Sequence, residues 1–221
     1  MSESPFGSLN LGGHVGDDPH AVEANRSVVA NSLGVQRDRL LFMQQCHGPD
    51  VVQVSGPWGA EGPPPADGVV SAERGLALAV LVADCTPVLL ADPENGVIGA
   101  VHAGRPGMTL GIVDVAVQRM RDLGATRIEA IVGPSVCGRC YEVPAAMRDE
   151  AAATRAESAT VSWSGTPAID VAAGVVAQLA AADVRVAQWL PGCAREDSRL
   201  FSYRRDGRTG RFAGIVVLDA A

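Results

Sequence analysis

A chain of 221 residues fits one globular domain better than two small ones, and we expect residues 1–221 to form a single catalytic domain. Hydrophobic residues make up 47% of the chain but aromatic residues only 4%, so the core must consist of Ala, Val, Leu and Ile, and 25 glycines with 14 prolines argue against a helical bundle. The formal net charge of −7 argues against nucleic-acid binding, because such binding uses Lys and Arg to neutralise phosphates.

The first predicted helix follows a stretch, MSESPFGSLN, that has neither the basic region nor the apolar core of a signal peptide. Asp18 can cap this helix, and Pro19 has the fixed backbone angle that suits a first turn. Gly34 marks its end. Its apolar face consists of Val22, Val29 and Leu33.

Short apolar runs predict buried strands further along the chain. They cover residues 40–43, 51–54, 76–82, 87–91, 97–102, 128–133, 184–189 and 212–218. Helical spacing predicts two more helices, over residues 109–123 and 170–182, the second capped by Asp170. The longest apolar run, residues 76–83, is too short to span a bilayer. Because strands and helices alternate, we expect an α/β fold in which mixed β-sheets are layered with α-helices around one core; the strand order stays open.

The four histidines and five cysteines of the chain are its candidates for metal ligands and nucleophiles. An odd number of cysteines in a chain without a leader favours reduced thiols in the cytoplasm, where metal binding and catalysis are their specialised uses. His47 lies in QQCHGPD, Cys85 in VADCTP, and His102 precedes AGRPG. Each lies where a predicted strand gives way to a turn, which is where a rigid framework can present side chains to a cavity.

Two imidazoles and one thiolate suit Zn²⁺, and three protein ligands leave a fourth position open, as in catalytic zinc sites. The three residues are far apart in sequence and form no compact motif. Their spacing therefore leaves a second interpretation open, in which His47 and His102 are hydrogen-bonded core histidines and Cys85 is an inert buried thiol.

Six segments in order resemble the laccase-domain family, whose members include purine nucleoside phosphorylases and peptidoglycan editing factors. They are SLNLGGHVGDDPHAVEANR, QCHGPDV, ADGVV, VADCTPVLLADPENGVIGAVHAG, GPSVCGRCYEVP and FSYRRDGRTGRFAG, which together extend over nearly the whole chain. The resemblance implies a fold of the laccase-domain type, related to cytotoxic necrotizing factor-like cysteine hydrolases. It also implies one zinc ion per chain, bound by His47, Cys85 and His102, with copper less favoured.

The same resemblance implies that the substrates are small molecules, namely a purine nucleoside and phosphate. The expected reactions are phosphorolysis of adenosine, inosine and methylthioadenosine, and hydrolytic deamination of adenosine, with His47, Cys85 and His102 as catalytic residues. The name peptidoglycan editing factor implies an alternative, a cysteine or zinc hydrolase of muropeptide precursors in which Cys85 and His102 form a thiolate–imidazole pair, with His47 as an alternative partner of Cys85. Because a zinc-bound thiolate cannot also be a free nucleophile, metal content distinguishes the two.

Two further interpretations are less favoured. A copper polyphenol oxidase needs many histidine ligands, and this chain has four histidines in total. A zinc module without turnover needs four protein ligands in a closed site, and only three are evident.

Arginines are the candidate phosphate ligands, because a guanidinium group offers a planar set of donors. Arg26 lies on the first predicted helix, and Arg204 and Arg205 lie in a turn-rich segment that continues to Arg208 and Arg211. Many relatives read H-A-G-W-R-G where this chain reads HAGRPG, so the corresponding arginine, Arg105, stands one place earlier.

The remaining candidates have open or structural interpretations. Asp84 is either a catalytic residue, which moves a proton or binds a ribose hydroxyl, or a hydrogen-bonded turn aspartate. Cys137 and Cys140 form a lone CxxC, which we interpret as a tight loop with two free thiols, since no second CxxC or nearby histidine accompanies it. We interpret His14 and His20 as surface residues and Cys46 as a packing residue.

Overall fold

The computed structural model describes residues 1–219 of the chain. Its strands are β1 (Leu40–Phe42), β2 (Val51–Gln53), β3 (Gly68–Ser71), β4 (Leu76–Val82), β5 (Thr86–Asp92), β6 (Val97–Ala103), β7 (Glu129–Val132), β8 (Ala159–Val161), β9 (Pro167–Ile169), β10 (Arg185–Trp189) and β11 (Phe212–Leu218). Its α-helices are α1 (Pro19–Ser32), α2 (Arg105–Thr109), α3 (Ile112–Asp122), α4 (Ala145–Thr154), α5 (Val171–Ala181) and α6 (Tyr203–Asp206).

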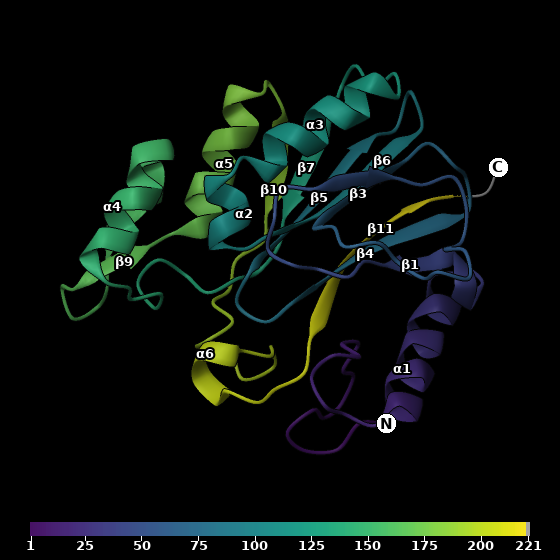
Figure 1. Ribbon diagram of the computed structural model, residues 1–221, viewed down its shortest axis with the longest axis horizontal. Coiled ribbons are helices and arrows are strands. Elements are labelled where there is room, and N and C mark those ends of the chain that lie inside the picture. Colours follow the sequence, from purple (N-terminus) through teal and green to yellow (C-terminus); the bar gives the residue numbers. More distant parts are fainter. Residues whose placement is uncertain (220–221) are drawn as a thin grey trace.

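Two stacked β-sheets form the centre of the protein, and helices cover their outer faces (Figure 1). The larger sheet has the strand order β10-β7-β5-β6-β3-β2, and the smaller sheet has the order β1-β4-β11. Both sheets mix parallel and antiparallel pairs, for example β1 parallel and β11 antiparallel to β4. Strands β8 and β9 form a separate hairpin. The expected α/β fold with layered mixed sheets is confirmed.

Strand β4 shows how the layers pack, because its side chains alternate between two apolar clusters. Leu78 and Val80 pack with Ile98 of β6 between the two sheets. Ala79 points the other way and packs with Ala30 of α1. Leu78 is fully buried, and burying a leucine side chain contributes about 1.5–3 kcal/mol. The apolar run of β4 is therefore continuous because both of its faces are covered.

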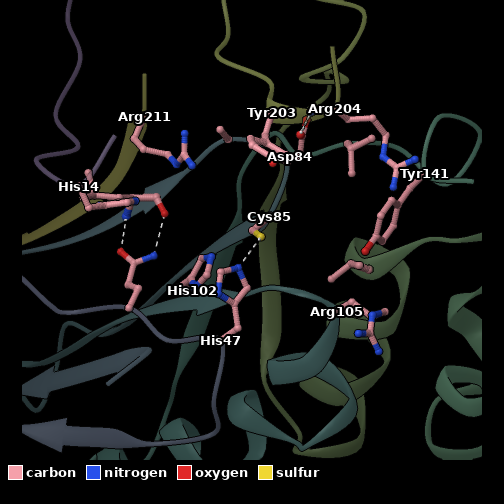
Figure 2. A pocket seen from close by; sticks show the side chains of 15 residues that line it. His14, His47, Asp84, Cys85, His102, Arg105, Tyr141, Tyr203, Arg204 and Arg211 are labelled. Atoms are coloured by element: carbon pink, nitrogen blue, oxygen red, sulfur yellow. Dashed lines mark hydrogen bonds between the residues drawn. The ribbon is translucent and has the colours of Figure 1, made fainter. Parts of the chain in front are cut away.

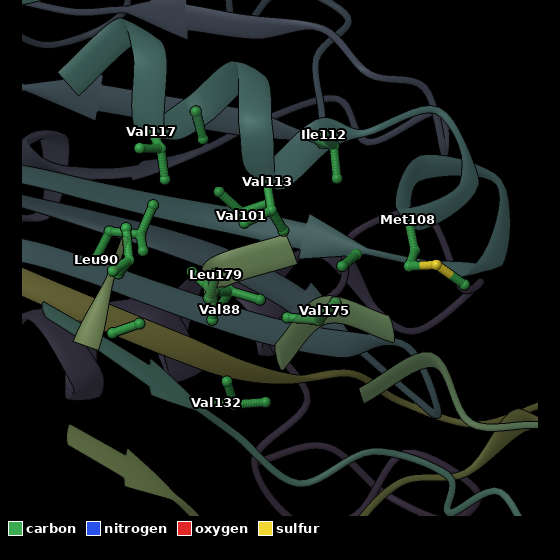
Figure 3. Close-up of a cluster of buried hydrophobic side chains, with 14 of the residues drawn as sticks. Val88, Leu90, Val101, Met108, Ile112, Val113, Val117, Val132, Val175 and Leu179 are labelled. Atoms are coloured by element: carbon green, nitrogen blue, oxygen red, sulfur yellow. The ribbon is translucent and has the colours of Figure 1, made fainter. Parts of the chain in front are cut away.

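The opposite face of the larger sheet is covered by α3 and α5 (Figure 3). Val88 and Val101 of the sheet pack with Val113 of α3 and Leu179 of α5. Both predicted helix caps near these layers are present. The Asp18 side chain accepts a hydrogen bond from the backbone N–H of His20, and that of Asp170 accepts one from Ala173.

The predicted helix over residues 109–123 is wrong at its start. Gly111 adopts a left-handed backbone with a φ of 81°, which separates the short helix α2 from α3. Helices α4 and α6 and strands β3, β8 and β9 were not predicted. The only buried residue of α4 is Ala151, so its sequence shows no apolar stripe, and the three strands have at most four residues each.

None of the helices that the structure describes has the length and apolar character needed to cross a membrane.

Candidate metal centre and its pocket

Three side chains from distant parts of the chain meet at one point (Figure 2). The ligand atoms of His47, Cys85 and His102 all lie within 4.8 Å of one another. The Sγ atom of Cys85 is 3.7 Å from Nε2 of His47. The two imidazole rings are nearly perpendicular, at 80°, with centroids 4.7 Å apart. The structure thus brings together the three residues that the sequence proposed as ligands, in a donor set that can bind a metal ion.

Turns at strand ends position these side chains. Asp84, with a φ of 89°, forms the turn by which the chain leaves β4 in the smaller sheet and enters β5 in the larger one. Cys85 therefore directly precedes β5. His102 lies on the neighbouring strand β6, in register with Pro87. His47 has a left-handed backbone, with a φ of 64°, in the loop between β1 and β2.

Asp67, which the sequence analysis missed, holds both histidine segments. Its Oδ1 atom lies 2.7 Å from Nδ1 of His102 and accepts a hydrogen bond from the backbone N–H of His47 at 2.9 Å. Its Oδ2 atom accepts from the backbone N–H groups of Cys46, at 3.1 Å, and Gly48, at 2.7 Å. With Nδ1 occupied in this way, Nε2 of His102 is the nitrogen available to a metal, which is the carboxylate–histidine arrangement common around bound metals.

Gly104 leaves the space in which the donors approach one another. A Cβ atom at this position would lie 2.7 Å from Cδ2 of His47 and 3.2 Å from Sγ of Cys85. The first distance is shorter than real carbon contacts allow, so any side chain here would displace His47.

The pKa values of Cys85, His102 and Asp67 depend on the charges and hydrogen bonds that these groups share. Burial raises the pKa of the Cys85 thiol, but the charge of His102 and hydrogen bonds with both histidines outweigh burial and lower this pKa to about 6. Burial lowers the pKa of His102, but the Cys85 thiolate and Asp67 raise it to about 9. Burial raises the pKa of Asp67, yet its hydrogen bonds hold it well below the usual range. Near neutral pH, the metal-free centre is therefore a thiolate–imidazolium pair beside a carboxylate.

The Cys–His cluster forms part of the wall of a cavity of about 690 Å³. This volume lies within the range of about 300–1,000 Å³ that is common for small-molecule sites. Arg105, Arg204 and Arg211 line the cavity, whereas Asp84 is the one carboxylate among its lining residues. The cavity is therefore locally positive, although the chain as a whole carries −7.

The four arginines proposed as phosphate ligands divide into two groups. Arg105 and Arg204 line the cavity. Arg26 and Arg205 are not among its lining residues. Nε of Arg26 donates to the carbonyl of Leu11 at 2.9 Å. Arg205 donates to carbonyls of the segment 194–200 and forms an ion pair with Asp206.

Arg211 reaches the cavity because the SLNLGG segment is tied to the start of β11. Oδ1 of Asn10, which is fully buried, accepts hydrogen bonds from the backbone N–H groups of Gly12 and Arg211. The backbone N–H of Leu11 donates to the carbonyl of Arg211 at 3.0 Å. The N-terminal segment thereby also brings His14, an exposed residue as predicted, to the cavity.

Asp84 is engaged as a turn aspartate. Its Oδ1 atom accepts a hydrogen bond from Oγ of Ser202 at 2.6 Å, and its Oδ2 atom accepts from the backbone N–H of Arg204 at 2.7 Å. These bonds fix the beginning of α6, and with it Arg204, against the cavity. Of the remaining minor candidates, His20 is exposed as predicted. Cys46 is exposed as well, so its prediction as a packing residue is wrong.

The comparisons with known proteins agree with the layered α/β fold. The sequence model of the family described as multi-copper polyphenol oxidoreductase laccase matches residues 1–219. The chain belongs to this family.

Individual relatives match over nearly the full chain. A purine nucleoside phosphorylase of Streptomyces coelicolor is 57% identical over 222 residues, which cover 99% of this chain and 91% of the relative. A purine nucleoside phosphorylase of Corynebacterium glutamicum is 45% identical, covering 99% of this chain and 90% of the relative. The crystal structure of YlmD from Geobacillus stearothermophilus matches with a TM-score of 0.90 and 29% identity, covering 100% of this chain and 88% of that one.

Proposed function

We propose that this protein is a zinc-dependent enzyme of purine nucleoside metabolism. Its reactions are phosphorolysis of adenosine, inosine and methylthioadenosine, and deamination of adenosine. The observation that carries the proposal is the Cys–His cluster in the wall of a nucleoside-sized cavity that three arginines line. The names of the relatives from Streptomyces coelicolor and Corynebacterium glutamicum support it.

The donor set of His47, Cys85 and His102 fits zinc better than copper. Two imidazole nitrogens and a thiolate are ordinary zinc ligands, and three protein ligands leave an open position. A multicopper centre needs more histidines than the four in this chain. When bound, zinc supplies Lewis acidity to the cavity. Asp67 accepts the Nδ1 proton of His102 and thereby keeps Nε2 directed at the metal position.

The lining of the cavity suits a nucleoside together with phosphate. In phosphorolysis, a phosphate oxygen bonds to the anomeric carbon while the bond from that carbon to the base breaks, and the base leaves with a proton. Arg105, Arg204 and Arg211 can hold the phosphate with charge-assisted hydrogen bonds. The rings of Tyr141 and Tyr203 also line the cavity, and an aromatic ring offers a stacking surface to a base.

One observation favours a second function for metal-free protein, that of a cysteine hydrolase acting on muropeptide precursors. Cys85, His102 and Asp67 are arranged as nucleophile, base and orienting carboxylate. The lowered pKa of Cys85 would supply a thiolate at neutral pH. Zinc bound to this thiolate would occupy the nucleophile, so the two functions exclude each other in one molecule.

We place this activity in the cytoplasm, with small molecules as partners. All five cysteines of the chain, each within the described residues, are free thiols, which suits a reducing compartment. We expect neither nucleic acid nor a membrane among the partners.

The experiment is turnover of adenosine by zinc-loaded and zinc-depleted protein, with and without phosphate, measuring inosine, adenine and hypoxanthine separately. Zinc-dependent adenine release that requires phosphate supports phosphorolysis, and inosine formation without phosphate supports deamination. If zinc-depleted protein keeps full turnover and iodoacetamide abolishes it, the cysteine-hydrolase function replaces the proposed one.

A further inference from the structure

A second group of metal-ligand side chains lies outside the Cys–His cluster. The donor atoms of Cys137, Cys140, Cys193 and Glu196 all lie within 4.8 Å of one another. The CxxC pair, expected to be alone, is therefore completed by a third thiol and a carboxylate from a segment more than fifty positions further along the chain. We refer to these four residues as the three-cysteine cluster.

Two similar turns present the four donors. The backbone N–H of Cys140 donates to the carbonyl of Cys137 at 2.9 Å, and that of Glu196 donates to the carbonyl of Cys193 at 3.0 Å. Each turn thus directs two side chains, three positions apart, to the same side. Pairs of donors at this spacing are the usual building unit of structural zinc sites.

The two turns are held side by side independently of any metal. Ser135 and Cys193 form a parallel β-bridge, and the backbone N–H of Ala194 donates to the carbonyl of Ser135 at 2.9 Å. Arg205 also fixes the second turn, because its Nη1 atom donates to the carbonyls of Ala194, at 2.8 Å, and Asp197, at 3.1 Å. The donors are therefore preorganised.

Two of the four donors in the three-cysteine cluster are buried, whereas Cys137 is partly exposed and Glu196 is exposed. Cys140 is 3% exposed and Cys193 is 8% exposed. The Sγ atom of Cys140 donates to Oε1 of Glu196 at 3.2 Å, and Nε1 of Trp163 approaches the same oxygen at 3.4 Å. Three thiols and a carboxylate at these distances form a donor set for a divalent cation, which would replace the thiol protons.

We propose that Cys137, Cys140, Cys193 and Glu196 form a second zinc site with four protein ligands. Binding releases one proton from each of the three thiols, and the thiolates and the carboxylate coordinate the ion. Four protein ligands close the coordination sphere, so the site is structural. It holds no position for substrate, in contrast to the three-ligand centre of His47, Cys85 and His102.

The three-cysteine cluster lies next to residues that line the cavity, so zinc bound there would stabilise the cavity wall. Val136 and Tyr141, which line the substrate cavity, directly flank the CxxC turn. The Tyr141 ring lies 4.7 Å from the guanidinium carbon of Arg204, which also lines the cavity. Zinc at the three-cysteine cluster would thus join the wall formed by residues 134–142 to the loop formed by residues 193–200.

The first test is metal content in a two-by-two set of variants. His47→Asn removes a ligand of the first centre, and Asn tolerates the left-handed backbone found there. Cys140→Ser removes a ligand of the second. After loading with zinc, we expect two equivalents in the wild-type protein, one in each single variant and none in the double variant. A wild-type protein with one equivalent, lost completely in His47→Asn, would overturn the second site and leave the first intact.

The second test does not depend on the folding of a buried variant. Iodoacetamide labelling of zinc-loaded His47→Asn protein, followed by peptide mass spectrometry, should show Cys137, the partly exposed thiol of the cluster, protected until a chelator is added. Cys46 and Cys85, which lie outside the cluster, should label to the same extent in both conditions. Equal labelling of Cys137 with and without chelator, or a disulfide among the three cysteines in protein purified without reductant, would overturn the proposal.

Discussion

Oδ1 of Asp67 lies 2.7 Å from Nδ1 of His102, and both side chains are almost completely buried, at 0% and 3% exposure. The same carboxylate accepts backbone hydrogen bonds from three consecutive residues, of which His47 is the middle one. A single buried carboxylate therefore sets the orientation of one histidine ring and the backbone position of the other. The geometry of the candidate metal centre depends on a residue that is not itself in the donor set.

We expect Asp67→Asn to weaken zinc binding at the first centre about 10- to 100-fold, the usual effect of losing such a partner. The amide keeps the size of the carboxylate, but its NH₂ group cannot accept hydrogen bonds from the backbone. Competition with a chelating dye measures the affinity. Asp92→Asn is a matched control, since Asp92 is also fully buried and caps backbone N–H groups, but lies at the far end of β5. Equal zinc affinity in the two variants would contradict this role for Asp67.

Gly104→Ala should displace His47, because the added Cβ atom would lie 2.7 Å from the His47 ring. We expect it to reduce zinc affinity at least as much as Asp67→Asn does. The overall fold should persist, since the clash concerns a side chain in an exposed loop. Zinc content and far-ultraviolet circular dichroism measure the two effects. In the control Gly59→Ala, the added atom meets nothing within 4 Å. Full zinc occupancy in Gly104→Ala would show that the approach of the donors is not limited by this position.

In zinc-depleted protein, alkylation of Cys85 should become faster as the pH rises through about 6, because the thiol loses its proton there. Cys46 should react only at much higher pH, because its hydrogen bond to Asp67 raises its pKa above the ordinary value. Isotope-labelled iodoacetamide and peptide mass spectrometry give both rates in one sample. His102→Ala should move the Cys85 midpoint upward, since the positive charge that stabilises the thiolate is removed. A midpoint near the ordinary thiol value in the wild-type protein would contradict the thiolate–imidazolium pair.

Replacing the cavity arginines should weaken phosphate binding selectively. In Arg105→Ala, Arg204→Ala and Arg211→Ala, loss of a charge-assisted hydrogen bond costs about 1.5–3 kcal/mol, which raises the phosphate KM roughly ten- to a hundredfold for each residue that contacts it. Arg26→Ala is the control, because the Arg26 guanidinium group binds the carbonyl of Leu11 and is not among the lining residues of the cavity. The deamination rate, which needs no phosphate, reports on folding. An unchanged phosphate KM in all three cavity variants would exclude this phosphate site.

Continuously apolar strands and helices marked by a cap were predictable from the sequence. The bounds of β4 and β11 agree with the predicted runs over residues 76–82 and 212–218, because these strands are apolar along their whole length. Helices α1 and α5 followed from Asp18 and Asp170, which do cap them. The convergence of His47, Cys85 and His102 followed from their positions at strand ends combined with the family resemblance.

What the sequence did not reveal depends on pairing between distant segments. Asp67 is 35 positions from His102, and an isolated aspartate carries no signal of the histidine it will contact. In the same way, Cys137 and Cys193 are 56 positions apart, and the bridge between Ser135 and Cys193 helps to bring their turns together. Arg26 and Arg205 were proposed for their charge, whereas the orientation of their side chains, set by nearby carbonyls, removes them from the cavity.

The chain crosses from the smaller sheet to the larger one at Asp84, so Cys85 is covalently linked to both. Cys85 and His102 both belong to the larger sheet, where Thr86 pairs with Ala103, so a shear of the smaller sheet past the larger one would reach Cys85 only through the turn at Asp84. Even a small pull matters there, because metal–ligand distances tolerate only about 0.2 Å. The interlocked side chains between the sheets, such as Leu78 against Ile98, prevent this shear. Packing between the two sheets therefore helps to fix the distances among the three candidate ligands. Substitutions in this apolar layer should change metal affinity before they unfold the protein.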